Sequence, residues 1–333
     1  MRHFLIVGFL VLVVAVATYA GLNAAELMPV EASAQAVPID WMWNYQVMAM
    51  SFLFALIVVP LLYSLFVFRR KKGDTTDAEH IEGNTPLEIT WTVIPLIVVV
   101  TFAYMGAYSL RETRRVDPEA MVIKVHAQQF AWSFEYPEGF VTDELHMPVG
   151  QQVLLKMDSK DVIHSFWVPE FRVKQDVVPG RVTELRVTPT LEGNYKVRCA
   201  ELCGAAHYSM EKKVVVTDGD TYQKWVSEQV EAYAAAQTPE GMGELLVKAN
   251  GCLGCHTISG AALVGPTWKG LFGSQVSLAG GSTVTADEAF ISESITNPSA
   301  AIVAGFEGAA AMPAYTFTEE ELSYIIAYLM TLK

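Results

Sequence analysis

Two long apolar runs dominate the first 115 residues of the chain. Val47 to Phe68 is almost uninterrupted and leads into four consecutive basic residues, and Trp91 to Tyr108 has only two threonines as polar interruptions. Allowing one more turn at the start of the second run, each is long enough to cross the apolar core of a bilayer as a helix. The pattern predicts a transmembrane hairpin within residues 37–115, with helices at about 46–68 and 89–110.

A third apolar run, Phe4 to Leu22, follows the first three residues. It is either a signal peptide, with cleavage sites offered by the small residues Ala32, Ala34 and Ala36, or a retained signal-anchor helix. Its length exceeds that of a typical signal core and favours retention. Residues 1–36 therefore form one targeting segment, and both alternatives leave the following segment outside the membrane.

Short runs of β-branched or alternating residues follow between residues 116 and 220, separated by glycine and proline turns. These runs are Met121–His126, Val153–Met157, Val182–Val187 and Val214–Val216. The pattern predicts a strand-rich domain. Residues 221–237 are polar and helix-prone, and we expect them to act as a linker that keeps the rest of the chain close to the sandwich.

The last part of the chain, residues 238–333, begins and ends with predicted helices. The first helix runs through Glu240 to Asn250, and the last opens at Thr318, which forms a capping box with Glu321. The pattern predicts a small all-α domain, which would be marginally stable without a staple.

The four cysteines fall into two clusters, and the second cluster supplies such a staple. Cys252, Cys255 and His256 read C-L-G-C-H, the attachment signature of c-type haem, in which two thiols reach the haem vinyl groups and the histidine ligates the iron. A structural disulfide or half of a zinc site would need no histidine directly after the second cysteine. The motif predicts one covalently bound haem c.

An electron-transfer haem of this kind needs a second axial ligand, and a methionine sulfur raises its potential. Met312 is the best candidate, because Pro313 ends any preceding regular structure and fixes a loop. Met330 falls inside the last helix and Met242 inside the first, where we expect packing or exposed residues. The alternative for Met312 is an ordinary core or loop methionine.

The first cysteine cluster stands among other metal-binding residue types. The candidate ligands are His164, Cys199, Glu201, Cys203, His207 and Met210. A mononuclear blue copper site would need only one of the two thiolates. Two thiolates can instead bridge two copper ions, each with one histidine and one weak ligand, either the Met210 sulfur or the Glu201 backbone carbonyl. A zinc site made of two cysteines and two histidines is the alternative.

Both clusters lie in stretches that resemble known families. Residues 238–333 resemble a class I cytochrome c domain, including C-L-G-C-H and the segment GPTWKGLFG from Gly265 to Gly273. The stretches SKDVIHSFWVPEFRVKQDVVPGR from Ser159 to Arg181 and CAELCGAAHYSM from Cys199 to Met210 resemble the dinuclear copper (CuA) domain of cytochrome c oxidase subunit II. The resemblance implies a cupredoxin-like Greek-key β-sandwich for residues 116–220. The complete ligand set argues against a copper-free relic of the kind found in quinol-oxidising relatives.

The resemblance also implies partners and a location. Neither span of the hairpin contains a histidine, so an oxygen-reducing centre must lie in another chain, which in this family is the haem-copper catalytic subunit I. Haem attachment occurs outside the bacterial cytoplasmic membrane, so the loop between the spans lies inside and both metal domains lie on the outer face. Membrane lipid surrounds the spans, and no nucleic acid partner is expected.

Two carboxylates gain candidate roles from the same resemblance. Glu88, just before the second span, matches the subunit II glutamate that helps protons enter a channel of the partner. The alternative is an ordinary carboxylate at a helix start. The side chain of Glu201 would reach a magnesium ion shared with the partner.

One aromatic segment departs from the family pattern. The family often has a tryptophan close to the point of electron entry, whereas this chain reads QQFAWSFEYP with Phe130 at that place and Trp132 two residues on. The entry residue is therefore left open. His126 and His146 lie outside the ligand motifs, and we expect them to be satisfied or surface histidines.

The formal net charge of the chain is −13, and residues 238–333 contribute −6 of it, with three lysines against nine carboxylates. Such a surface either steers a basic redox partner toward the haem domain or simply solubilises it.

Together these features predict a subunit II of a caa-type oxidase. An upstream donor, a cytochrome c or a quinol-oxidising complex, would reduce haem c, which would reduce the copper, and subunit I would then reduce oxygen and pump protons. The alternatives are the electron-input subunit of a copper-containing nitric oxide reductase and a free-standing membrane-anchored electron shuttle. The Glu88 motif and Glu201 argue against the shuttle, which would use neither.

Overall fold

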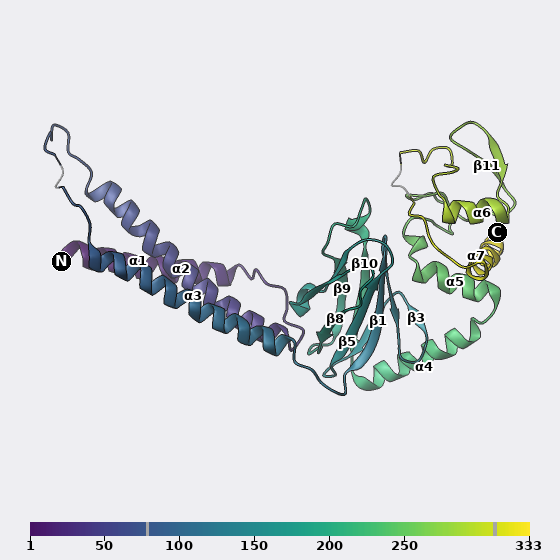
Figure 1. Cartoon of the computed structure of the whole chain (residues 1–333), viewed down its shortest axis with the longest axis horizontal. Helices are drawn as coiled ribbons and strands as arrows, with labels where there is room; N and C mark the ends of the chain where they lie inside the picture. The colour runs from purple at the N-terminus through teal and green to yellow at the C-terminus, as the bar shows by residue number, and fades with distance from the viewer. Residues whose placement is uncertain (78–79, 309–311) are drawn as a thin grey trace. The chain divides into compact units, whose positions relative to one another are not determined.

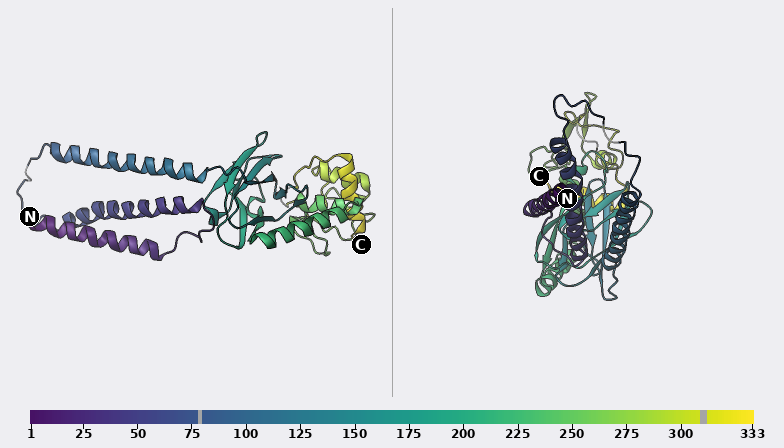
Figure 2. Two further views of the ribbon diagram at one scale, coloured as in Figure 1. Left: turned by 90° about the horizontal axis from the view of Figure 1, so that it is seen from below. Right: turned by 90° about the vertical axis from the view of Figure 1, so that its left-hand side faces the viewer.

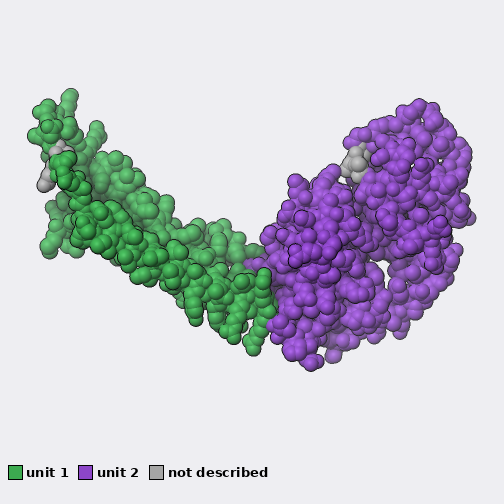
Figure 3. All heavy atoms as spheres, in the orientation of Figure 1, with its two compact units in different colours: residues 1–31, 35–115 green, residues 32–34, 116–333 purple. Residues whose placement is uncertain are grey.

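The computed structural model describes residues 1–77, 80–308 and 312–333. The chain divides into two compact units (Figure 3). One unit comprises residues 1–31 and 35–115, and the other comprises residues 32–34 and 116–333.

The first unit consists of three long helices, α1 (Arg2–Ala24), α2 (Ala36–Val67) and α3 (Thr85–Thr113) (Figure 1). All three helices are long and apolar enough to cross a membrane. Helix α1 packs along α2 (Figure 2), with Ala15 and Ala55 among the residues of the contact. Small residues allow helices to approach closely within a bilayer.

Helices α2 and α3 are both longer than the apolar runs suggested. Helix α2 starts at Ala36 and continues through Trp41 and Tyr45, aromatic residues of the type that lines the membrane surface. Helix α3 starts at Thr85, where the Asn84 side chain accepts a hydrogen bond from the Leu87 N–H. The predicted spans, at about 46–68 and 89–110, therefore began later than helices α2 and α3 do.

The second unit contains a β-sandwich of two five-stranded sheets. One sheet has the order β3-β2-β1-β5-β8 and the other β4-β10-β9-β6-β7. The strands are β1 (Met121–Gln128), β2 (Ala131–Glu135), β3 (Val141–Thr142), β4 (Leu145–Pro148), β5 (Val153–Ser159), β6 (His164–Trp167), β7 (Lys174–Val177), β8 (Thr183–Val187), β9 (Gly193–Cys199) and β10 (Glu211–Thr217). The predicted sandwich is thus confirmed.

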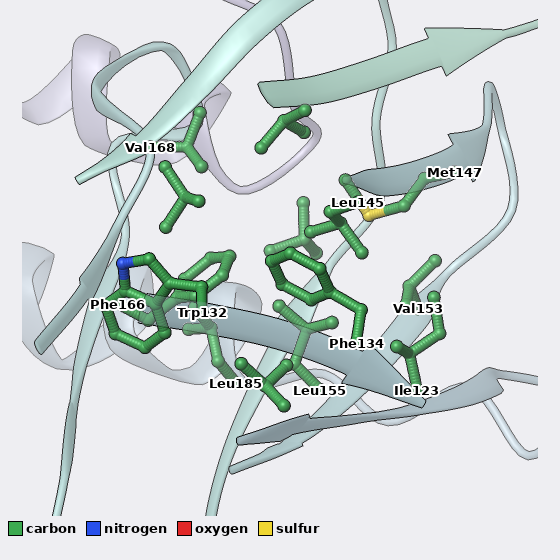
Figure 4. Packing of buried hydrophobic residues seen from close by; sticks show 14 of the residues in the cluster. Ile123, Trp132, Phe134, Leu145, Met147, Val153, Leu155, Phe166, Val168 and Leu185 are labelled. Carbon is green, nitrogen blue, oxygen red and sulfur yellow. The ribbon is translucent and has the colours of Figure 1, made fainter. Parts of the chain in front are cut away.

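Alternating residues of these strands fill the space between the two sheets. In β1, Ile123, Val125 and Ala127 are fully buried while Val122 and Lys124 are exposed. The core also contains large aromatic residues, which Figure 4 shows in close packing. Burial of this one apolar face sets the register of the sheets.

A short segment from the beginning of the chain belongs to the sandwich. The Ala32 N–H donates to the Glu170 carbonyl, and the Ala34 N–H donates to the Thr188 carbonyl. Both Ala32 and Ser33 are fully buried. Two of the predicted cleavage positions, Ala32 and Ala34, therefore form backbone hydrogen bonds with the sandwich.

Helix α4 (Gly219–Ala235) occupies the predicted linker and is packed against the sandwich. The Asp218 side chain caps it by accepting from the N–H groups of Asp220 and Thr221. The Trp225 ring stacks on His146 with a centroid separation of 3.9 Å and an interplanar angle of 5°. The linker is thus a docked helix, a feature that its polar composition did not predict.

The C-terminal helices α5 (Pro239–Ala249), α6 (Glu288–Thr296) and α7 (Glu319–Thr331) form a separate small core. Helices α5 and α7 cross where Gly243 lies against α7, since a Cβ at residue 243 would be 2.0 Å from the Tyr324 carbonyl oxygen. The predicted capping box is present between Thr318 and Glu321. A short hairpin, β11 (Gln275–Ser277) and β12 (Thr283–Thr285), adds two strands that we did not predict.

Candidate metal centre and haem cavity

The first site lies at one end of the sandwich, where neighbouring strands bring distant residues together. His164 opens β6 and Cys199 ends β9, and these strands pair with each other. The loop after β9 carries Cys203, and a short 3-10 helix, η2 (His207–Ser209), carries His207.

All six predicted ligands converge at this end. The two cysteine sulfurs are 3.8 Å apart. Cys199 Sγ lies 3.8 Å from His164 Nδ1 and 3.1 Å from the Glu201 carbonyl oxygen. Cys203 Sγ lies 3.5 Å from His207 Nδ1 and 3.8 Å from Met210 Sδ.

This arrangement pairs each cysteine with one histidine and one weak donor. The two adjacent sulfurs are in position to be shared by two ions, and the remaining donors divide evenly between them. A single tetrahedral zinc ion would use only the cysteines and histidines and leave the Met210 sulfur without a role. The donor set therefore fits two copper ions better than one zinc ion.

Hydrogen bonds orient the ligands and set their protonation. Asp161 Oδ1 accepts from His164 Nε2 at 2.8 Å, which leaves Nδ1 facing the sulfurs. Burial works against ionisation of Cys199, but hydrogen bonds from His164 and from backbone groups outweigh it and lower the pKa of this thiol to about 6. Burial and the neighbouring Cys199 raise the pKa of Cys203. Cys199 is thus the more acidic thiol of the pair.

Asp161 was not predicted as part of the site, although it stands three residues before His164 in a quoted motif. Trp132 is also close to the ligands. Its ring meets the His164 ring edge-on at 6.1 Å, and its Nε1–H donates to the Met210 carbonyl at 3.3 Å. The alternating pattern of the strand indicates that Trp132 is buried. It cannot show that the ring contacts the loop that carries Met210.

The second site is a cavity of about 370 Å³ in the C-terminal domain. Cys252 and Cys255 lie in and directly after a 3-10 turn, η3 (Cys252–Gly254), and line the cavity together with His256. Met312 also lines it. The remaining wall is mostly apolar and includes Trp268, Phe290, Ile291, Phe317, Ile325 and Leu329.

The His256 ring is held in one orientation. Its Nδ1 donates to the Pro266 carbonyl at 2.8 Å, and its ring stacks on Trp268 with a centroid separation of 4.8 Å. Burial lowers the pKa of His256, so the ring is neutral and Nε2 is the nitrogen left to ligate a metal. Both partners belong to GPTWKGLFG, a segment for which no specific role was predicted.

Two thiols, a neutral histidine and a methionine around an apolar cavity fit a covalently attached haem. Met312 lines the described cavity, whereas Met242 and Met330 are not among its lining residues. Residues 309–311, which precede Met312 in the predicted loop, lie outside the described part of the chain.

The remaining candidate residues have ordinary contacts. The Glu88 side chain accepts from the Asn84 N–H at 3.2 Å, so it caps α3. His126 lies between Asp158 at 2.7 Å and Glu135 at 3.3 Å, and His146 is covered by Trp225. Both histidines are satisfied by neighbours, as expected.

Comparisons with known proteins agree with this architecture. Residues 17–111 match the family model of the cytochrome c oxidase subunit II transmembrane domain. Residues 140–218 match that of the periplasmic domain of the same subunit, and residues 242–333 match cytochrome c.

Individual relatives extend the sequence similarity along the chain. A cytochrome c oxidase subunit 2 from Alkalihalophilus pseudofirmus is 33% identical over 87% of this chain and 87% of its own length. One from Synechocystis is 36% identical over 67% of this chain and 80% of its own length. The solved periplasmic domain of subunit II of cytochrome oxidase from Bradyrhizobium japonicum is 29% identical, with a TM-score of 0.33, and covers 35% of this chain and 98% of that structure.

The membrane helices, the sandwich and the cytochrome domain define a membrane-anchored electron-transfer protein with copper and haem as cofactors. The chain belongs to the cytochrome c oxidase subunit 2 family. It is an electron-transfer subunit of that oxidoreductase, in the arrangement with a fused C-terminal cytochrome c domain.

Proposed function

We propose that this chain passes electrons from an external donor through haem c to a dinuclear copper centre, and from there to the haem-copper catalytic subunit I. When bound, the copper and the haem would each supply a one-electron carrier. The chain's own residues hold these groups in place and tune their potentials.

The observation that carries the proposal is the division of donors around the touching Cys199 and Cys203 sulfurs. His164 would hold one copper and His207 the other, with Cys199 and Cys203 as shared ligands. The Met210 sulfur and the Glu201 carbonyl would be the weak ligands. Cys252, Cys255, His256 and Met312 would hold the haem.

We further propose that both metal domains lie on the outer face of a bacterial cytoplasmic membrane. The Glu201 side chain is exposed, so it is free to reach a magnesium ion at the interface with subunit I. The cap that Glu88 provides to α3 supports the ordinary structural role for this residue. Its role in proton entry stays a prediction.

Purification of the complex in mild detergent, followed by metal and haem analysis, tests the assignment. We expect two copper ions and one covalently bound haem for each copy of this chain, together with a copurifying subunit that contains further haem. The copper should give a mixed-valence signal from one electron shared by two ions. Zinc in place of copper, or one copper with a blue-copper spectrum, would contradict the proposal.

A further inference from the structure

Strand β2 is buried on both of its faces, although only one face points into the sandwich core. Trp132 and Phe134 fill the core between the sheets. Ala131 and Ser133 belong to the opposite face, yet they are only 2% and 8% exposed. A strand at this position in a two-sheet sandwich normally shows one face to solvent, so another element must cover it.

The cover comes from the haem domain of the same chain. Helix α5 contacts β2 and β3, and Gly251, two residues after α5, lies against Ala131. A Cβ at residue 251 would be 2.4 Å from the Ala131 Cβ, and the backbone there has a φ of +68°. Both the close approach and the left-handed backbone favour glycine at this position.

A buried hydrogen bond continues the contact beside this glycine. Gln128 Nε2 donates to Asn250 Oδ1 at 2.6 Å, and the two residues are 8% and 5% exposed. Gln128 pairs with Ala131 across the sheet, so both residues present the same face to the haem domain. Asn250 immediately precedes Gly251 and the haem attachment motif.

Gln129 contacts both the haem domain and the loop that carries Cys203. Its Nε2 donates to the Cys203 carbonyl at 2.5 Å, and its own carbonyl lies 3.4 Å from the Tyr315 hydroxyl. Tyr315 lines the haem cavity, and so do Gln129, Phe130 and Ala206 of the sandwich. One wall of the haem cavity is therefore built by the segments that also support the copper ligands.

We propose that Gln128, Gln129 and Ala131 form a docking seat that holds the haem domain of the same chain in one position at the copper end of the sandwich. The significance of the seat for electron transfer rests on the function proposed above. The named contacts are neutral, so salt should leave the docked state unchanged. Electron transfer from haem to copper would then not require the haem domain to diffuse to the sandwich first.

A wedge at Ala131 tests the seat in the full-length chain within its complex. Ala131→Phe places a ring where Gly251 lies, and overpacking of this kind should lower the docked population about tenfold or more. Val122→Phe is the matched control, because Val122 lies on the same face of the same sheet and is exposed. Gln128→Met is a second, gentler variant that keeps the side-chain length and removes the donor to Asn250.

The rate of amide hydrogen exchange in residues 128–133 and 250–253 measures docking independently of the metals. Flash reduction of the haem measures the rate of electron transfer to copper in the same samples. We expect faster exchange and slower transfer in Ala131→Phe and Gln128→Met, with the copper signal and haem spectrum unchanged and with Val122→Phe like the parent. Unaltered exchange and transfer in both seat variants would overturn the seat while leaving the proposed function intact. A parent complex that docks but contains no copper pair would overturn the proposed function instead.

Discussion

Replacing Trp225 by alanine should release helix α4 from the sandwich without unfolding either domain that it connects. The Trp225 ring stacks on His146 and meets Tyr136 and Phe140 at centroid separations of 5.1 and 5.6 Å. Truncating a fully buried aromatic residue costs about 3–5 kcal/mol. Trp225 is only partly buried, so we expect a loss of about 2 kcal/mol, which includes the extra contribution of its aromatic pairs.

Amide hydrogen exchange in the full-length protein measures this loss directly. A change of about 2 kcal/mol in the free energy of local opening should speed exchange across residues 219–235 about 30-fold. Lys224→Ala is the control, because it removes only an exposed ion pair to Glu228 and should change exchange about twofold or less. Equal protection of α4 in Trp225→Ala and the parent would refute the view that these rings dock the helix.

Three further predictions concern the two sites and a histidine away from them. Met312→Leu should lower the haem potential and alter the reduced spectrum while the haem stays covalently attached, and an unchanged redox titration would move the ligand role to another methionine. Cys203→Ser should abolish the shared mixed-valence copper signal in electron paramagnetic resonance, and its persistence would rule out bridging by two thiolates. A hydrogen bond to Asp158 raises the pKa of His126, so its charged form contributes stability that is complete below about pH 6.5 and is lost as pH rises through the raised value. The thermal stabilities of the parent and of His126→Gln, measured at several pH values, should therefore converge toward high pH. A difference in stability that is the same at every pH would contradict this.

Local motifs account for the parts of the two sites that the sequence could predict. The haem attachment residues are adjacent in the chain, and the Thr318–Glu321 cap spans a single helical turn. Their geometry follows from spacing alone. Five of the six copper-site candidates likewise lie within twelve residues, in CAELCGAAHYSM.

Contacts between segments far apart in the chain could not be predicted in this way. The stack of Trp225 on His146 and the bond from Gln128 to Asn250 depend on how a helix or a domain packs on the sandwich. The hydrophobic pattern shows whether a segment is a helix or a strand, but it does not show which segment packs against it. The same reason explains why Asp161 was overlooked, since its role appears only once β6 and β9 place His164 beside the sulfur of Cys199.

In the proposed relay, electrons enter at haem c and reach the copper within the same chain. Rapid mixing of the intact, oxidised complex with its physiological donor tests this most directly, with haem c and copper followed at separate wavelengths. Haem c should be reduced first, and copper reduction should follow as haem c is reoxidised. Reduction of copper ahead of haem c would contradict it and would make the fused cytochrome a side branch.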